Sequence, residues 1–259
     1  MPADEWRDEI MSHILNLVER QITAANLRNN TAEIVPQPGR YVTENGAAFG
    51  PCLLISRECG SGGGILAQRA GERLGWNVFD SKIVDEIAQV ARVHQRLVKS
   101  VDEHVHSYWE QTWREMLLDD LADEKYFRHL KEIIIALGYQ GNVVIVGRGA
   151  QYFLPTPCAL RVRLIAPLED RARRVAELDE LPVEKARLRA EMIDKERAAF
   201  IWKTFRKDVA SPANYDLVIN TGQIDLLGAT DLVLAAMDKK LGVHVKEAGG
   251  SHKKALATA

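Results

Sequence analysis

The chain has 259 residues, a formal net charge of −2 and 46% hydrophobic residues, which is ordinary for a globular protein. The balanced charge argues against a nucleic-acid partner, because domains that bind nucleic acid are usually strongly basic; three cysteines without paired spacing argue against a disulfide framework or a cysteine zinc site. The chain begins without the basic and apolar regions of a signal peptide and contains no apolar run of about 20 residues, so we expect a cytoplasmic protein with no membrane partner.

Residues 1–30 are predicted to form an amphipathic helix. Its apolar face consists of Trp6, Ile10, Ile14 and Leu17. Because a single helix is marginal in water, we expect this face to pack on the main domain or on a second copy of the chain in a homo-oligomer. Residues 31–50 contain prolines and glycines without a clear period, which is typical of a linker.

The main domain is predicted to span residues 51–245. Its expected strands have the sequences CLLIS, NVF, NVVIVG, ALRVRLIA and YDLVIN. Apolar strands that alternate with helices predict a parallel sheet covered by helices on both faces. A helical region is expected at about 81–140, and an arginine-rich helical stretch, interrupted near Pro182, at about 168–208. The small and polar residues 246–259 are predicted to be a disordered tail.

The first strand runs directly into a glycine cluster, SRECGSGGG. Glycines permit positive φ and let backbone N–H groups approach phosphate oxygens closely. The helix that follows adds the positive end of its dipole. The predicted phosphate-binding loop consists of Gly60, Ser61, Gly62, Gly63 and Gly64. A glycine-rich turn without a ligand is the alternative.

The cluster differs from the usual phosphate-binding loop, G-x-x-x-x-G-K-[ST], at both functional side chains. Gly63 stands at the lysine position and Gly64 at the hydroxyl position, while Arg57 occupies the position of the first glycine. The loop therefore keeps a backbone cradle without its cation or its magnesium-facing hydroxyl. Arg57 and Arg69 are the local candidates to supply the missing charge.

These residues resemble the cytidylate kinase-like family, a branch of the P-loop nucleoside monophosphate kinases. The loop of that family, S-R-x-x-G-S-G-G, is similar to ISRECGSGG…LGWNVFD in this chain. Its G-R-D and E-x-R-A-x-R-R run is similar to VVIVGRGAQYFLPTPCALRVRLIAPLEDRARRV, and its D-x-x-R motif is similar to IDKERAAF. The branch typically lacks the loop lysine, so the resemblance makes Gly63 a family trait. It covers about residues 51–242 and implies a three-layer α/β/α fold with a five-stranded parallel sheet, a helical insertion and a lid.

The resemblance also implies an acceptor site. Arg148 falls on the arginine of G-R-D and, with Arg197, is expected to hold the acceptor phosphate. Asp80 and Asp194 match positions that contact the nucleoside, and Lys82 lies near enough in sequence to reach a phosphate. Each residue also has a structural alternative. Arg148 could form an ion pair between sheet and helix, and Asp80 could cap a helix. Asp194 and Arg197 could form an i,i+3 pair on a helix surface, and Lys82 could simply be solvated.

Arg171 and Arg174 fall on the lid arginines of the family, which close over the phosphates during transfer. They are three residues apart and therefore share a helix face, where two guanidinium groups are able to pair with one phosphate. With Arg57 they form the predicted catalytic set. The alternative is a solvated helix with surface ion pairs to its acidic neighbours.

The match is incomplete at the positions that read the base. Gly149 replaces the aspartate of G-R-D, Ala190 replaces an arginine, and the G-x-x-Y-R run after Asp80 is absent. No metal site is predicted within the chain, because no cluster of cysteines and carboxylates supports the group of His94, His104 and His106.

The resemblance implies transfer of the γ-phosphate of ATP, with Mg²⁺, to a small acceptor, with the pyrimidine nucleotides CMP or dCMP preferred. The expected partners are therefore nucleotide small molecules. Two alternatives stay open. One is a non-catalytic nucleotide-binding or regulatory module on the same fold, and the other is a kinase for a different small phosphate acceptor.

Overall fold

The computed structural model describes residues 3–30, 38–101 and 124–244. His104, His106 and the predicted tail lie outside the described residues, as do the side chains of Trp6 and Ile10. None of the described helices is both long enough and apolar enough to cross a membrane.

Five strands form one sheet in the order β4-β5-β3-β6-β7, and all neighbouring strands are parallel. The strands are β3 (Cys52–Arg57), β4 (Asn77–Phe79), β5 (Val143–Val146), β6 (Ala159–Ile165) and β7 (Leu217–Asn220). The central strand β3 carries the glycine loop at its carboxyl end, at the edge of the sheet where ligands of parallel sheets bind. The structure therefore confirms the predicted fold class.

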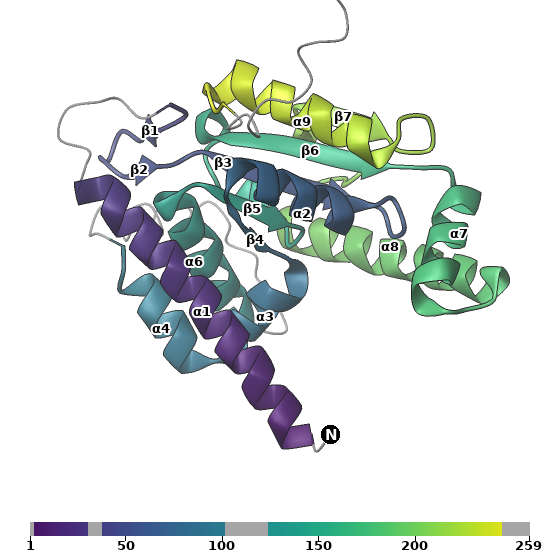
Figure 1. The fold of residues 1–259 in the computed structure, drawn as a ribbon, viewed down its shortest axis with the longest axis horizontal. Helices are drawn as coiled ribbons and strands as arrows, with labels where there is room; N and C mark the ends of the chain where they lie inside the picture. The colour runs from purple at the N-terminus through teal and green to yellow at the C-terminus, as the bar shows by residue number, and fades with distance from the viewer. Residues whose placement is uncertain (1–2, 31–37, 102–123, 245–259) are drawn as a thin grey trace, which may run out of the picture.

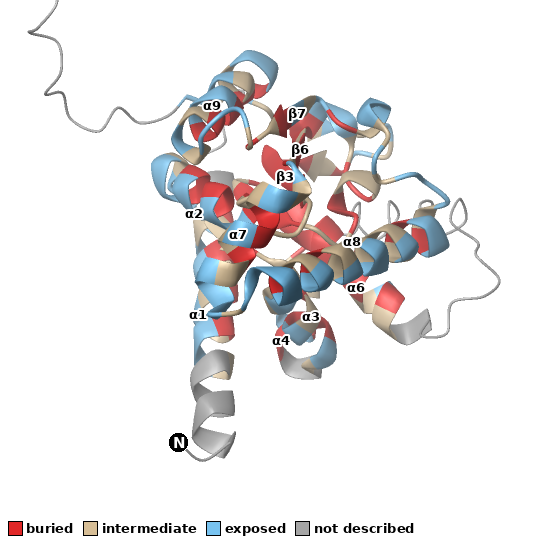
Figure 2. Cartoon of the chain, turned by 90° about the vertical axis from the view of Figure 1, so that its right-hand side faces the viewer, coloured by how far each residue is buried: buried red, intermediate tan, exposed pale blue. Residues whose placement is uncertain are grey.

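Helices cover both faces of the sheet, in three layers (Figure 1). One face is covered by α2 (Gly63–Leu74) and α9 (Leu226–Leu241), and the opposite face by α3 (Ser81–Gln89), α4 (Ala91–Val98) and α6 (Glu124–Gln140). The hairpin of α7 (Leu168–Asp179) and α8 (Val183–Phe205) follows β6. Short 3₁₀ helices span Ala150–Tyr152, Thr156–Cys158 and Pro212–Asn214. Buried residues concentrate on the strands and on the helix faces that touch them (Figure 2).

The N-terminal helix α1 (Ala3–Asn30) packs against α4 and α6. Ile14 and Val18 are buried in this contact. Gln21 is also buried; its Nε2 donates to the carbonyl of Gly141 (2.7 Å), and its Oε1 accepts from Asn77 (2.8 Å). Helix α1 thus buries an apolar face on the main domain of its own chain. A role in a homo-oligomer stays a prediction.

The segment before the sheet is more ordered than a linker. Residues 38–50 contain an antiparallel pair, β1 (Tyr41–Val42) with β2 (Ala48–Phe49). Phe49 is fully buried in the core beneath α6. A Cβ on Gly50 would lie 2.7 Å from the Cα of Gly141, so the two backbones approach each other because neither residue has a side chain. The partners of this segment are distant in sequence, which is why its local pattern does not reveal them.

Candidate functional site

A cavity of about 710 Å³ lies at the carboxyl end of β3. Its volume is within the range of small-molecule and cofactor sites. Its walls come from β3, the first turn of α3, the turn after β5, β6 and α8. The charged lining residues are Arg57, Lys82, Arg148, Arg163, Lys195 and Arg197 on the cationic side and Glu58, Asp194 and Glu196 on the anionic side. This excess of positive charge favours an anionic ligand.

The glycine loop beside the cavity has the backbone conformation of an anion cradle. Gly60 and Gly62 have φ of +80° and +84°, and α2 begins at Gly63. A Cβ on Gly60 would lie 2.5 Å from the carbonyl oxygen of Arg171, so the loop is pressed against α7 and requires glycine there. The start of α2 and the exposed Gly64 leave the positive end of the helix dipole open to an anion.

The stem of Arg57 occupies the space where a side chain at position 63 would begin. A Cβ on Gly63 would lie 2.8 Å from both Cβ and Cγ of Arg57, and a Cβ on Gly147 would overlap its guanidinium. The guanidinium donates to Ser81 Oγ at 3.2 Å, and no carboxylate of the described residues forms an ion pair with it. Burial and the nearby charges of Arg197 and Arg148 lower the pKa of Arg57 to about 10. A cation in this environment is stabilised by a bound anion.

Arg148 and Arg197 also reach the cavity, but each has an acidic neighbour. Arg148 Nε donates to Asp85 Oδ1 at 2.8 Å, and its Nη2 contacts the other carboxylate oxygen. Burial would lower the pKa of Arg148, but its hydrogen bonds to the Asp85 carboxylate and the negative charge of that group raise the pKa overall. Arg197 donates to the carbonyl of Arg57 (3.2 Å) and lies 3.6 Å from Asp194; burial lowers its pKa.

The backbone of Arg148 is in the left-handed region, with φ of +53°, between two glycines that also have positive φ. A residue with a side chain rarely adopts this conformation, and such residues cluster at ligand sites. The turn directs the arginine from the end of β5 toward Asp85 on α3. Asp85 was not among the predicted site residues; it does not line the cavity, but it holds the side chain of Arg148.

Arg171 and Arg174 are bound to the backbone of the loop and do not line the cavity. Arg171 donates to the carbonyls of Ala166 (2.9 Å) and Cys59 (3.0 Å), and Arg174 to the carbonyl of Gly60 (3.2 Å). Arg171 is 8% exposed, so it does not belong to the solvated helix face that was the alternative prediction. In this structure both arginines hold the shape of the loop.

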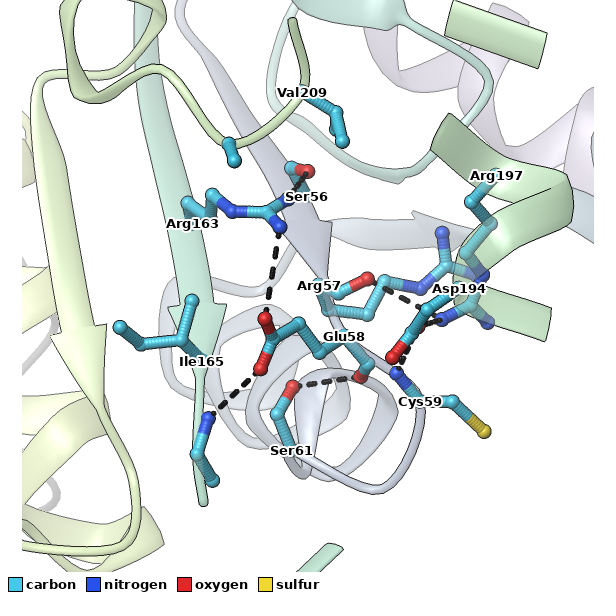
Figure 3. A network of polar contacts seen from close by, with 12 residues as sticks. Ser56, Arg57, Glu58, Cys59, Ser61, Arg163, Ile165, Asp194, Arg197 and Val209 are labelled. Carbon is cyan, nitrogen blue, oxygen red and sulfur yellow. Dashed lines mark hydrogen bonds and ion pairs between the residues drawn. The ribbon is translucent and has the colours of Figure 1, made fainter. Parts of the chain in front are cut away.

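Asp194 belongs to α8, and its carboxylate points toward the loop (Figure 3). Its Oδ1 accepts a hydrogen bond from the backbone N–H of Cys59 (2.7 Å), and its Oδ2 pairs with Arg171 (2.7 Å). Asp80 caps α3 by accepting from the N–H groups of Lys82 and Ile83, and it does not line the cavity, whereas Lys82 does.

Arg163, Ser56 and Glu58 complete the cavity and were missed in the sequence (Figure 3). Arg163 Nη1 donates to Ser56 Oγ at 3.0 Å, and its Nη2 lies 3.9 Å from Glu58. Ser56 and Arg163 are register partners in β3 and β6. The signal available in the sequence was an arginine inside an otherwise apolar strand. In the structure Arg163 is only 7% exposed, and a buried arginine requires polar partners.

The loop fits a phosphate group but offers no ligand for Mg²⁺. Ser61 is fully buried and donates to the carbonyl of Glu58 at 2.9 Å, so its hydroxyl is used within the loop. Glu58 and Asp194, the carboxylates nearest the loop, are each engaged by Arg171. Mg²⁺ in sites of this kind is usually held by one or two carboxylates together with substrate phosphates, and these two carboxylates are already paired.

Three comparisons relate the chain to known proteins. The cytidylate kinase-like family matches residues 53–223. A cytidylate kinase from Archaeoglobus fulgidus is 28% identical over 199 residues, which cover 75% of this chain and 99% of that protein. A crystal structure of an uncharacterized protein from Eubacterium ventriosum has a TM-score of 0.59 and 21% identity, covering 73% of this chain and 98% of that chain. The structural similarity supports the fold alone.

A uronate isomerase from Corynebacterium glutamicum is 29% identical over 125 residues. The match covers 48% of this chain but only 24% of that protein. The chain therefore spans about a quarter of that relative, and isomerase chemistry is not transferred to it.

Proposed function

Because this chain belongs to the cytidylate kinase-like family, we propose that it transfers the γ-phosphate of ATP to a small acceptor bound in the cavity, with CMP or dCMP as the first candidates. Membership of the family supports a kinase-like function. The observation that carries the proposal is the position of Arg57 between the glycine loop and the cavity. It forms no ion pair with a carboxylate of the described residues, and the charge of Asp80 acts on it from beyond ion-pair distance.

Phosphoryl transfer depends chiefly on positioning and on neutralising charge. In our proposal the backbone of the loop and the start of α2 hold the phosphates of ATP. Arg57 supplies the charge that Gly63 lacks, because its stem packs on the loop at Gly63 and its guanidinium lies beside Gly147 and Ser81 at the cavity wall. A guanidinium is able to pair with two phosphate oxygens at once, which suits a group that bridges donor and acceptor.

The acceptor phosphate is assigned to Arg148, Arg197 and Lys82, all of which line the cavity. An ionised phosphate acceptor needs no general base. Asp194 is assigned to positioning the loop through Cys59, and Asp80 to capping the helix that carries Ser81. Mg²⁺, when it is bound with ATP, adds further neutralising charge to the phosphates.

The second candidate is a nucleotide-binding module without catalysis. It is favoured by the loss of both functional side chains at Gly63 and Gly64, and by the carboxylate of Asp194 on a loop N–H. The cavity would then bind an anionic regulator instead of a substrate.

Measurement of ADP formation with Mg·ATP and each of CMP, dCMP, UMP, AMP and GMP tests the proposal. Transfer to CMP or dCMP above the background hydrolysis of ATP is the expected result. ATP binding by calorimetry without transfer to any of the five would contradict nucleoside monophosphate kinase activity and favour the module. Transfer to AMP or GMP alone would retain the chemistry and reject the pyrimidine assignment.

A further inference from the structure

Three side chains with metal-binding atoms meet between α4 and α6. They are His94, His129 and Glu132, and one ligand atom of each lies within 4.8 Å of the others. None of them lines the cavity. His129 and Glu132 are three residues apart and share a face of α6, and His94 comes from α4, which packs on that helix. His94 is 8% exposed and the other two are half-buried, so the cluster is shielded from bulk water.

The hydrogen bond of His129 selects the tautomer that a metal ligand requires. Its Nδ1 lies 3.0 Å from the carbonyl oxygen of Ala88 near the end of α3, and only an N–H pairs with a carbonyl oxygen. Nε2 is therefore the unprotonated nitrogen of the neutral ring, and it has no hydrogen-bond partner among the described residues. Metal-bound histidines donate their second nitrogen to a backbone carbonyl or a carboxylate in the same way.

The two rings lie close together but have to turn to share an ion. The His94 and His129 rings are stacked, with centroids 4.2 Å apart and planes inclined by 28°. Two imidazoles that bind one ion tetrahedrally have centroids about 5 Å apart, given nitrogen–metal bonds of about 2.0 Å, so a ring must rotate for both nitrogens to face the ion. His94 Nε2 lies 2.8 Å from Glu132 Oε2, which is close enough for both atoms to coordinate one ion after a small rotation.

We propose that His94, His129 and Glu132 bind one divalent transition-metal ion of the zinc class, with water completing the coordination. Two imidazole nitrogens and one carboxylate oxygen are typical ligands of Zn²⁺ and related ions. Mg²⁺ is a poor match, because it prefers oxygen ligands in a nearly ideal octahedron. The site is therefore separate from any magnesium that accompanies ATP.

The ion would join helices that carry one wall of the cavity. It would link α4 to α6 directly, and the bond from His129 to Ala88 extends the link to α3. The first turn of α3 contributes Ser81 and Lys82 to the cavity. Because an ion that binds only the folded state stabilises it by mass action, metal binding should raise the stability of this region.

Calorimetric titration of the chelator-treated full-length protein with Zn²⁺ tests the proposal, with Co²⁺ absorption spectra recorded in parallel. One saturable site per chain and a Tm that rises with Zn²⁺ but not with Mg²⁺ are expected. His129→Ala and Glu132→Gln should each weaken binding about 10-fold or more, whereas His13→Ala, which removes an exposed histidine of α1, should leave it unchanged.

Absence of a saturable site in the unaltered protein would overturn the proposal. So would equal affinity in His129→Ala and Glu132→Gln, or a thiolate absorption band with Co²⁺, because Zn²⁺ would then be bound elsewhere, for example at Cys59. Circular dichroism without metal shows whether each variant folds, and the nearly isosteric Glu132→Gln keeps the test valid if His129→Ala does not. Kinase activity is not part of the readout, so the test is independent of the proposed function.

Discussion

The side chain of Arg57 lies across Gly63, the position at which the usual phosphate-binding loop carries its lysine. The two residues are complementary in space, since a Cβ at position 63 would lie 2.8 Å from two carbons of the arginine. Glycine at this position is thus a packing requirement of Arg57. The charge enters the site from the end of β3 instead of from the first turn of α2.

Replacement of Arg57 by methionine should abolish most activity while it stabilises the unliganded protein. Methionine retains the apolar stem and removes a charge whose pKa is lowered by burial and by two arginines. We expect kcat to fall about 10²–10³-fold, as for loss of a preorganised charge-stabilising group, and Tm to rise by about 2–4 °C. Steady-state kinetics and thermal unfolding measure both. Arg69→Met, on the exposed face of α2, is the matched control and should change neither.

Introduction of the missing lysine at position 63 should damage the protein. The new side chain would collide with the stem of Arg57, and overpacking of this kind costs about 1–3 kcal/mol. We expect Gly63→Lys to lower both the urea midpoint and kcat. Gly64→Lys is the control, because no atom lies within 4 Å of a Cβ there.

The double variant Arg57→Ala/Gly63→Lys separates steric collision from loss of charge. Removal of the arginine stem should restore part of the stability lost in Gly63→Lys. If the double variant were as unstable as Gly63→Lys alone, the contact between residues 57 and 63 would not be the cause.

Substitution of Asp194 by asparagine should loosen the loop. The carboxylate pairs with Arg171 and accepts from the N–H of Cys59, so its loss leaves a buried arginine with weaker partners. We expect a loss of about 1–3 kcal/mol in the free energy of unfolding and a higher KM for ATP. Glu184→Gln, on the same helix, exposed and outside the cavity lining, should change both quantities little. A lower KM for ATP in Asp194→Asn would show instead that the carboxylate competes with phosphate for the loop.

The contribution of Asp216 to stability should depend on pH. Burial would raise the pKa of Asp216, but hydrogen bonds from Arg161 and Lys240 lower it overall. A carboxyl with a lowered folded pKa stabilises the protein fully above its unfolded pKa of about 3.9, and this stability is lost as the pH falls through the lower folded value. Asp216→Asn should therefore cost about 1–3 kcal/mol at pH 7, and the difference should shrink below about pH 4.

Urea unfolding of the unaltered and Asp216→Asn proteins at pH 7, 5 and 3 measures this dependence. Asp231→Asn removes an exposed carboxylate paired with Arg73 and should cost little at every pH. A difference between the unaltered and Asp216→Asn proteins that stayed constant from pH 7 to pH 3 would refute the electrostatic explanation.

The architecture was predictable from the sequence because its signals are local. The apolar strand CLLIS, the glycine cluster and the helix after it lie within about 25 residues of chain, and strand–helix alternation predicts a parallel sheet without knowledge of any contact. The cap formed by Asp80 is equally local, since it involves only the next three residues. The two-residue strands β1 and β2 were not predicted, because they are very short and β2 packs on the distant α6.

The sequence by itself determined the fold class, the position of the glycine loop and the set of arginines around it. It could not show which of four arginines is available to bind a phosphate: Arg57, Arg148, Arg171 or Arg174. Each of them finds its partners far along the chain. Arg148 is neutralised by Asp85, 63 residues away, and Arg171 by Asp194, 23 residues away. Only the tertiary structure decided that Arg57 is the cavity-lining arginine of this set without an ion pair to a carboxylate of the described residues, because an ion pair depends on distance in space and not on separation in sequence. Arg174 also has no carboxylate partner there, but it donates to the carbonyls of Gly60 and Thr221 and does not line the cavity.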